Sequence, residues 1–595
     1  MLDLLPAEIL HMVDSVTDLA SLSRVNKPLH RFLLPFVYAS LVIKSDEQFL
    51  DRLKIVPLKT CFNGDGSRTI LNSLEFVKDL RLVAPIRERL WRRCDYRNYI
   101  THLRTQRRKL ERGEAHDSLM EDLDSSLRYV LFHLPEKSLR SFSWHLGCCV
   151  PSTILGVDGW LASKHNGIQG LSLVTDGTCL NQNTGFDGIL QLKDLRSFSW
   201  KGFHQTWPAH HQIIRQSLAL NCTLLESLEL EAIADLSHPL SVCDILSLQP
   251  EISEHDDEGQ ASNITANMMD PPTIKPLPTR LAALRHLSLS HISLKPYEGM
   301  MSAVSMEQLQ SLKLLCCLHA LEFISRLTGS GLNMSLRSFE LVSEEVSVDP
   351  SSGSLHIVSG FLHSFEGLEE LYLSTPASTI SLHDMLFGHR ASMKRLVLHM
   401  RRENDGAPLT LSGDTPGPRS EELGSIFRLV PLECVGLFQS PVLLKQELIS
   451  TPAAETIKLI HLRVSSHDSP GSTKSFNWFS EPEHECVLLV SMFPAAIRER
   501  IKAACMACLR DFAEWAFGPN GLPSLMVIAC GDFTRDGRFE QSQALLVREP
   551  TTSTDLYRVV SSGVHEHMLD RIFGARQMLG ACPVQPTIVR DGHGQ

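Results

Sequence analysis

The sequence predicts an α/β protein in which short strands and helices alternate along one elongated array. A leucine-bearing strand pattern recurs along the chain, and the segments between its copies carry apolar residues at helical spacing. With 595 residues, 43% of them hydrophobic, the chain is longer than one compact core usually reaches. Either several domains or a repeat array must therefore bury its apolar side chains.

The recurring pattern places apolar residues at positions i, i+3 and i+5 of a short strand. Twelve copies begin at Val77, Leu139, Ile168, Leu195, Leu225, Leu284, Leu309, Leu336, Leu368, Met393, Leu432 and Ile457. Most neighbouring copies start 25 to 32 residues apart, and the intervals after Val77 and Leu225 are close to twice that step. This period is typical of a leucine-rich-repeat solenoid, in which each unit adds one strand and one returning helix.

Helical spacing between the strands supports the repeat interpretation. Residues 207–220, 318–327 and 355–365 repeat apolar side chains every three or four positions. We therefore expect a parallel sheet on the concave side and helices on the convex side over residues 46–480. Only Cys317 matches the Asn or Cys that the standard repeat carries eight residues after its first leucine, so the solenoid should be irregular.

The first 45 residues predict three short helices. Apolar residues recur at helical spacing from Leu2 to Val13, from Leu19 to Leu29 and from Phe32 to Leu41, and Pro6 suits a first helical turn. A helical cluster of this size needs a partner or the following domain to cover its apolar surface.

The same residues resemble the fungal F-box, on the motifs "LPAEIL" and "LASLSRVNKPLHRFLLPFVYASLVI" over about residues 3–44. The resemblance implies a three-helix F-box-like element that docks a Skp-type adaptor and, through it, a cullin scaffold. It also implies which side chains build the helices and face the adaptor: Leu5, Pro6, Ile9, Leu10, Leu22, Val25 and Leu29. In the alternative interpretation, the three helices only cap the solenoid.

The resemblance implies a non-catalytic substrate-recognition subunit of an SCF-type ubiquitin ligase, with the F-box at one end and a protein substrate held by the repeats. The alternative is an adaptor-independent leucine-rich-repeat scaffold. Because strand side chains alternate, positions i+2, i+4 and i+6 should face the concave side. We expect the substrate on the repeats between residues 336 and 463, at Glu340, Glu370, Tyr372, Arg395, His399, His461 and Arg463.

Three further segments depart from the repeat rhythm. Residues 250–280 are acidic and proline-rich and predict a disordered insertion, while residues 481–595 predict terminal degenerate repeats and a C-terminal cap. Ten Lys or Arg and only three acids lie between Arg87 and Arg112. A charged solvent-facing helix is favoured there over a nucleic-acid contact.

No motif in the sequence predicts catalysis. Phosphate-binding GxxxxGK[ST], GxSxG and HExxH patterns are absent, and Cys505 and Cys508 form a single C-x-x-C in an apolar helical context. We therefore expect no enzyme activity, cofactor or metal. The net charge of −11 argues against nucleic acid or anionic membrane as a general partner. The scattered cysteines, the acidic start and the lack of a long apolar run predict a cytoplasmic or nuclear protein.

Overall fold

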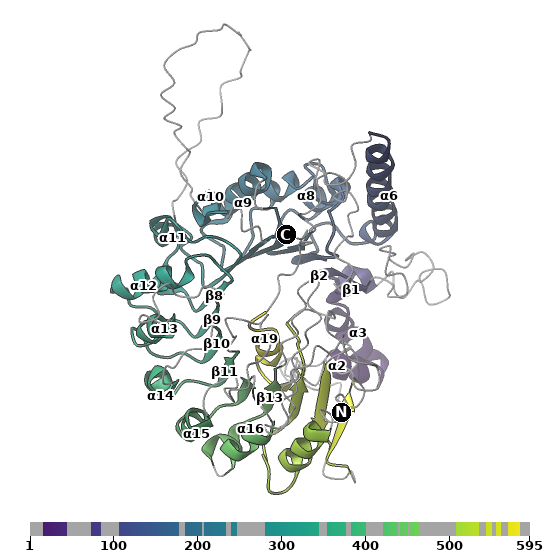
Figure 1. Cartoon of the computed structure of the whole chain (residues 1–595). Coiled ribbons are helices and arrows are strands. Elements are labelled where there is room, and N and C mark those ends of the chain that lie inside the picture. Colours follow the sequence, from purple (N-terminus) through teal and green to yellow (C-terminus); the bar gives the residue numbers. More distant parts are fainter. Residues whose placement is uncertain are drawn as a thin grey trace, which may run out of the picture.

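The computed structural model is an α/β structure whose sixteen strands form one curved sheet, an arrangement compatible with a solenoid (Figure 1). Strands adjacent in the sheet are also consecutive in the chain, so the sheet grows by one strand at a time. The residues that the structure describes are 16–44, 73–84, 106–175, 177, 185–204, 207–233, 240–246, 280–343, 354–375, 382–399, 420–437, 439, 441–449, 451–463, 507–534, 543–549, 555–560, 569 and 571–583.

All twelve leucine-bearing patterns become strands, and these strands, β2 to β13, pair in parallel. The prediction of a largely parallel sheet is therefore confirmed. The strands are β1 (Ser40–Lys44), β2 (Asp79–Val83), β3 (Ser141–His145), β4 (Gly170–Val174), β5 (Ser197–Phe203), β6 (Ser227–Ala232), β7 (His286–Ser290), β8 (Ser311–Leu315), β9 (Ser338–Val342), β10 (Glu370–Ser374), β11 (Arg395–Leu398), β12 (Cys434–Leu437), β13 (Leu459–Leu462), β14 (Val527–Cys530), β15 (Ala544–Arg548) and β16 (Tyr557–Val560).

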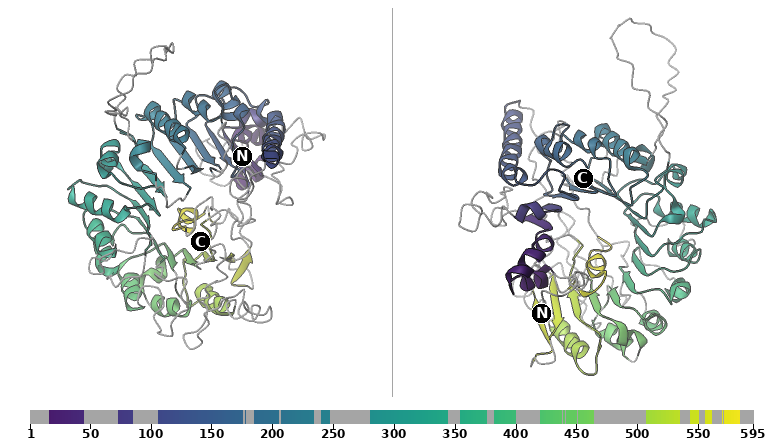
Figure 2. Two further views of the ribbon diagram at one scale, coloured as in Figure 1. Left: turned by 45° about the horizontal axis from the view of Figure 1, so that its top comes forward. Right: turned by 180° about the vertical axis from the view of Figure 1, so that it is seen from behind.

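Helices follow most strands and lie on the outside of the curve, while the strands line its inside (Figures 1 and 2). The α-helices are α2 (Val16–Ser23), α3 (Lys27–Val37), α6 (Gln106–Leu131), α7 (Ser152–Leu155), α8 (Trp160–Lys164), α9 (Pro208–Asn221), α10 (Val242–Leu246), α11 (Tyr297–Ala303), α12 (Ala320–Gly329), α13 (Ser354–Leu362), α14 (Leu382–Leu386), α15 (Ser420–Leu429), α16 (Pro441–Leu448), α17 (Pro452–Thr456) and α19 (Ala575–Leu579), with a further helix over residues 507–517. The 3-10 helices are η2 (Leu74–Phe76), η3 (Asp187–Gln191), η4 (Met306–Gln308) and η5 (Phe387–His389).

The main core fills the layer between the sheet and the outer helices. Leu80 and Leu82 of β2 belong to the same continuous buried cluster as Leu371 and Leu373 of β10, although almost 300 residues separate them. Each of these leucines occupies position i+3 or i+5 of its strand pattern. The alternation of side chains along a strand thus directs every unit's leucines outward, toward the helices.

Side chains three or four residues before one strand pattern accept the backbone N–H of the first residue of the preceding pattern. The Leu195 N–H donates to Oδ1 of Asn221 over 2.9 Å, and the Asn221 amide donates to the Leu192 and Ser217 carbonyls. The N–H groups of Leu139 and Leu368 donate in the same way to Nδ1 of His165 and His389, both over 3.4 Å.

These contacts explain how an irregular array holds without the standard polar ladder, since a buried N–H group must find an acceptor. Cys317, the one residue that matches the repeat consensus, does bond a backbone group. Its thiol donates to the Leu289 carbonyl over 3.2 Å.

The C-terminal end of the sheet differs from the expected run of degenerate repeats followed by a cap. β14 continues the parallel order, but β15 and β16 add to it in antiparallel fashion. Residues 569–583, which include α19, do not cap this end but return to the inside of the curve (Figures 1 and 2). The remaining expected strand, residues 486–493, lies outside the described residues.

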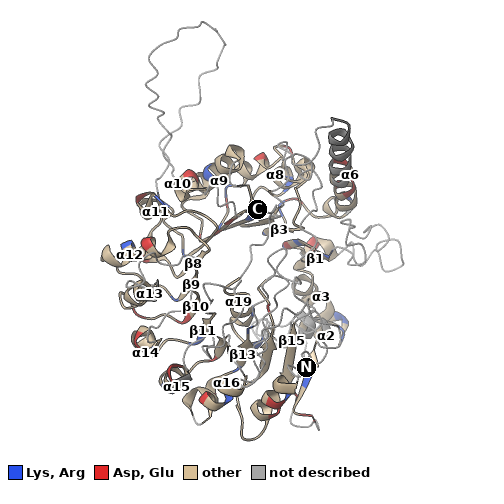
Figure 3. Cartoon of the chain, in the orientation of Figure 1, with Lys and Arg blue, Asp and Glu red and all other residues tan. Residues whose placement is uncertain are grey.

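The two other unusual segments are only partly described. Of the insertion at 250–280, only Arg280 falls within the described residues. The basic segment between Arg87 and Arg112 overlaps the structure only at the start of α6, whose later residues Leu123 and Leu127 join the main core. Positively and negatively charged side chains both occur on the outer helices (Figure 3).

Candidate binding surface on the inner face of the sheet

The inner face of the sheet carries the side chains that point away from the main core, and it has two regions. We call the inner face of β3–β8 the open half. We call the inner face of β9–β13 the covered half, because residues 569–583, here named the C-terminal segment, pack on it.

The open half carries polar side chains that pair across neighbouring strands. The Ser199 hydroxyl of β5 donates to Glu229 of β6 over 2.8 Å, and the Lys201 ammonium lies 2.9 Å from the same carboxylate. Burial in the concavity would raise the pKa of Glu229, but Lys201 and Ser199 favour the ionised form and hold that pKa at about 2. The Glu229 carboxylate is therefore ionised at neutral pH.

A second pair, Lys313 of β8 with Glu340 of β9, joins the open half to the covered half. The Lys313 ammonium lies 2.9 Å from Oε2 of Glu340, and the backbone N–H of Cys582 donates to Oε1 over 2.7 Å. Burial would lower the pKa of Lys313, yet the Glu340 carboxylate raises it, so the lysine stays charged. Glu340 thus binds a strand neighbour and the C-terminal segment together.

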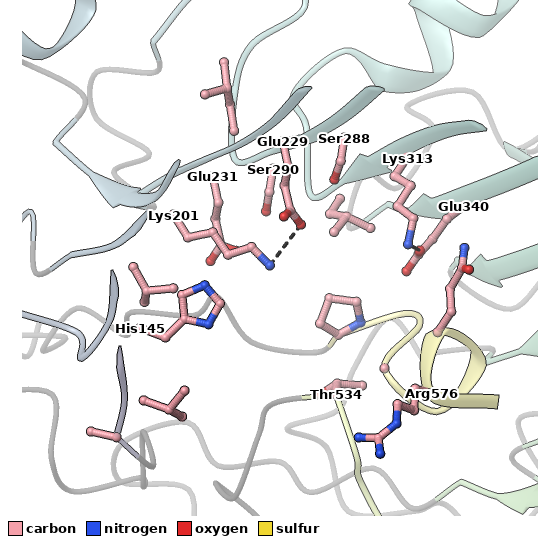
Figure 4. A pocket seen from close by; sticks show the side chains of 18 residues that line it. His145, Lys201, Glu229, Glu231, Ser288, Ser290, Lys313, Glu340, Thr534 and Arg576 are labelled. Carbon is pink, nitrogen blue, oxygen red and sulfur yellow. Dashed lines mark ion pairs between the residues drawn. The ribbon is translucent and has the colours of Figure 1, made fainter. Parts of the chain in front are cut away.

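A cavity of about 290 Å³ lies between the open half and the C-terminal segment (Figure 4). Its sheet side carries His145, Lys201, Glu229, Glu231, Ser288, Ser290, Lys313 and Glu340, and its far side carries Thr534, Arg576, Gln577 and Pro583. Both charge signs line it, and the two labelled lysines already pair with glutamates, so the cavity offers polar contacts without a strong excess of either charge.

The covered half contains an apolar cluster of its own. Val397, Cys434 and Leu459, from three strands, share a buried cluster with Met578 and Leu579 of α19. This cluster lies on the opposite side of the sheet from the main core, because these side chains point inward. Burial of apolar surface therefore stabilises the C-terminal segment on the sheet.

A buried ion pair lies beneath the same segment. Nε of Arg395 donates to Oε1 of Glu370 over 2.8 Å, and a second nitrogen of the same guanidinium also bonds that carboxylate. Ser338 and Gln577 donate to the other carboxylate oxygen, over 2.7 and 3.1 Å. Burial would lower the pKa of Arg395, but Glu370 raises it, so the guanidinium remains charged.

Arg463 bonds the end of the C-terminal segment. Its Nη2 donates to the carbonyls of Ala581 and Cys582 over 2.8 and 3.1 Å, and its Nε donates to Nδ1 of His399 over 3.2 Å. Arg463, which directly follows β13, reaches His399 beyond β11 across Gly436 of β12. An added Cβ at Gly436 would be in ordinary contact with Arg463, at 3.7 Å, but only 3.0 Å from Cγ2 of Val397.

The seven residues expected to bind a substrate do come together on the inner face, but they are not exposed. Each is at most 6% exposed: Glu340, Glu370, Tyr372, Arg395, His399, His461 and Arg463. The C-terminal segment covers the inner face at residues 336–463, so a substrate could reach these side chains only if that segment moved away, and substrate binding by them stays a prediction. Sequence reasoning placed these side chains on the correct face but could not see a segment that lies more than 100 residues away along the chain.

The predicted adaptor-facing residues are only partly described. Leu5, Pro6, Ile9 and Leu10 lie outside the described residues. Val25 is 57% exposed, Leu22 is half-buried, and Leu29 is buried with Leu19 and Leu33 inside the small helix cluster. Leu29 therefore holds α2 and α3 together and does not present a surface.

Several residues of this surface escaped the sequence analysis. Lys201 belongs to the strand pattern and could have been found from its position, whereas Gly574 and Gln577 belong to the segment that was expected to form a cap. The only local signal was the apolar spacing of Ile572, Ala575 and Leu579, which predicts a short amphipathic helix but not its location.

These features define the class of protein: an α/β chain with a long, mostly parallel curved sheet whose inner face holds its own C-terminal segment. No protein-family model matches the chain, and neither does any curated protein. Within the described ranges, no helix is long and apolar enough to span a membrane. Among the same residues, no group of three or more His, Cys, Asp and Glu side chains is placed to hold a metal ion.

Proposed function

We propose that the protein is the non-catalytic substrate-recognition subunit of an SCF-type ubiquitin ligase. In this proposal the N-terminal helices form an F-box that docks a Skp-type adaptor, and through it a cullin scaffold. The sheet and its helices form a leucine-rich-repeat solenoid that selects a protein substrate. The contribution to catalysis is proximity, because bringing two reactants together lowers the entropic cost of their reaction.

One observation carries the docking part of the proposal. The helices α2 and α3 share a small core of Leu19, Leu29 and Leu33, and other apolar side chains of the pair are partly exposed. Phe32 is 43% exposed and Phe36 is 36% exposed, and their ring centroids lie 5.9 Å apart on one face of α3. A neighbouring pair of exposed aromatic rings is the kind of feature that anchors a protein interface.

The packing of the helix pair explains why Phe32 and Phe36 lie on the side of α3 away from its small core. Asn26 caps α3, since its side chain accepts the N–H of Leu29 over 2.8 Å. The helix then places Leu29 and Leu33 inward and Phe32 and Phe36 outward at i, i+4 spacing. The sequence thus favours a stable helix pair with one apolar face turned outward.

Calorimetric titration of the full-length chain with a purified Skp-type adaptor tests the proposal. The wild-type chain should bind, and the Phe32→Glu/Phe36→Glu double variant should lose about 30-fold or more in affinity, since anchor residues are each worth about 2 kcal/mol or more. The matched control is Phe132→Glu, which charges another exposed phenylalanine, 72% exposed, next to α6. It should bind as the wild type does.

No binding by the folded wild-type chain would sink the proposal. It would leave the adaptor-independent scaffold as the function that the sheet supports.

A further inference from the structure

The C-terminal segment is held by contacts of the kind that hold a bound peptide. Side chains of the covered half bond its backbone: Arg463 donates to the Ala581 and Cys582 carbonyls, and Glu340 accepts the Cys582 N–H. Main-chain hydrogen bonds of this kind fix a segment largely independently of its sequence. Any segment with the same backbone shape could form them.

Apolar side chains of the segment pack against the sheet and make the contact depend on the sequence of the segment. Ile572, Met578 and Leu579 are buried in one cluster with Tyr372 and Val397 of the sheet. This cluster is separate from the main core, so its loss would not remove the leucines that hold the strands to the outer helices. The covered half therefore combines an apolar cluster with charged side chains, of which Glu340 and Arg463 bind the backbone of the segment.

The match between this surface and its occupant is incomplete. Four polar atoms on the inner face of the covered half are buried and make no hydrogen bond to any described residue: the hydroxyls of Tyr372 and Ser374, Nδ1 of His461 and Nη1 of Arg463. Each of the four residues is at most 3% exposed. A buried polar group without a partner costs about 1–3 kcal/mol, so an occupant that supplied partners here would bind more tightly than the resident segment.

We propose that the covered half is a groove for a peptide segment of a partner protein, and that the C-terminal segment is a resident occupant which the partner displaces. The partner segment has a short apolar helical turn, a following stretch with two free carbonyls, and polar side chains that reach Tyr372, Ser374 and Arg463. This inference deepens the proposed partner recognition by the repeats, on which it rests, and it is independent of adaptor docking.

Gly574 offers a way to release the segment without altering the groove. Its φ of +76° lies in the left-handed region, and an added Cβ would lie 2.9 Å from Nε of Arg395, whose guanidinium is fixed by Glu370. Gly580 is a matched control in the same segment, because its φ is −79° and an added Cβ would come no closer than 3.4 Å to any atom.

The test measures binding of a fluorescent peptide with the sequence of residues 569–583 to the full-length chain, by anisotropy. The Gly574→Val variant should bind it at least ten-fold more tightly than the wild type and the Gly580→Ala control. Equal binding by all three proteins would overturn the proposal. A doubled mass of the wild-type chain in sedimentation, with the segments exchanged between copies, would also overturn it and assign the groove to a second copy.

A measurement without any substitution guards against a Gly574→Val variant that does not fold. Excess isotopically heavy peptide is added to the wild-type chain, and hydrogen exchange is followed at residues 571–583. Competition should raise exchange there, above all at the Cys582 amide that Glu340 holds. Unchanged exchange at saturating peptide would contradict the proposal. Adaptor binding of the same proteins, measured in parallel, separates this failure from a failure of F-box docking.

Discussion

The open and covered halves of the inner face share one strand pattern but satisfy their polar side chains differently. In the open half, Lys201 and Glu229 pair across strands while water still reaches 26% and 37% of their side chains. In the covered half, Arg395 and Glu370 pair with only 3% and 8% exposed. The same geometry therefore gives a hydrated polar surface in one region and a second small core in the other.

The difference teaches that the position of a residue in the repeat does not decide its energetic role. Removing one member of a buried ion pair leaves an uncompensated charge, whereas an exposed pair contributes little. The following predictions use that contrast, from the largest expected effect to the smallest.

The Glu370→Leu variant should lose about 3–5 kcal/mol in the free energy of unfolding, because Arg395 would stay buried without its counter-charge. Urea denaturation measures this loss. The neighbouring Glu369 pairs with Lys394 over 2.7 Å at the surface, so Glu369→Leu should lose no more than about 1 kcal/mol. Similar losses for the two variants would mean that the covered half is open to water in solution.

The Met578→Ala variant should lose about 2–5 kcal/mol, because Met578 of α19 is fully buried in the inner cluster. The Phe573→Ala variant removes a larger side chain of the same segment, but one that is 82% exposed and contacts the Arg395 guanidinium through its ring. Its loss should be about 1 kcal/mol or less. The reverse order of the two losses would contradict this packing of the segment.

Acidification should destabilise the chain through its buried histidines. Burial lowers the pKa of His165 to about 4, below its ordinary value of 6.5, so the unfolded chain binds more protons between these two values. Stability is fully present above pH 6.5 and falls as the pH drops toward 4, by at most about 1.4 kcal/mol per pH unit for each such histidine.

Comparing urea denaturation at pH 7 and pH 5 measures this loss. His165→Asn should reduce the pH dependence and keep the backbone contact, since Asn221 makes the same contact in another unit. The exposed His356→Asn serves as control and should change nothing. A pH dependence that is the same in the wild type and in His165→Asn would show that folding does not change the pKa of this histidine.

The Lys201→Met variant, in the open half, should lose about 1 kcal/mol or less, because solvent screens its pair with Glu229. The loss should shrink further at high salt. Denaturation at low and high ionic strength measures both effects, and a loss as large as that of Glu370→Leu would erase the distinction between the two halves.

Much of the fold could be predicted from the sequence, because its signals are local. The spacing of leucines in each unit specified β2 to β13, and the helical spacing of residues 207–220 anticipated α9. The contacts of His165, Asn221 and His389 could not be predicted in this way. These residues lie three or four positions before the next strand pattern, but their contacts depend on two units lying side by side.

The binding surface divides in the same way. Alternation along each strand placed Tyr372, Arg395 and Arg463 on the inner face, as expected. Whether that face is open depends on a segment that follows them by more than 100 residues. Its apolar side chains would suit any exposed apolar surface equally well.

The sequence by itself determined an α/β array, the direction in which each strand's side chains point, and a small helical cluster with an apolar face at the N-terminal end. Only the tertiary structure decided which half of the inner face is covered, because burial and ion pairing between distant segments depend on the assembled curve of the sheet. The spacing of apolar residues specifies each strand and helix, and the packing of the assembled chain decides which segment contacts the inner face of the sheet.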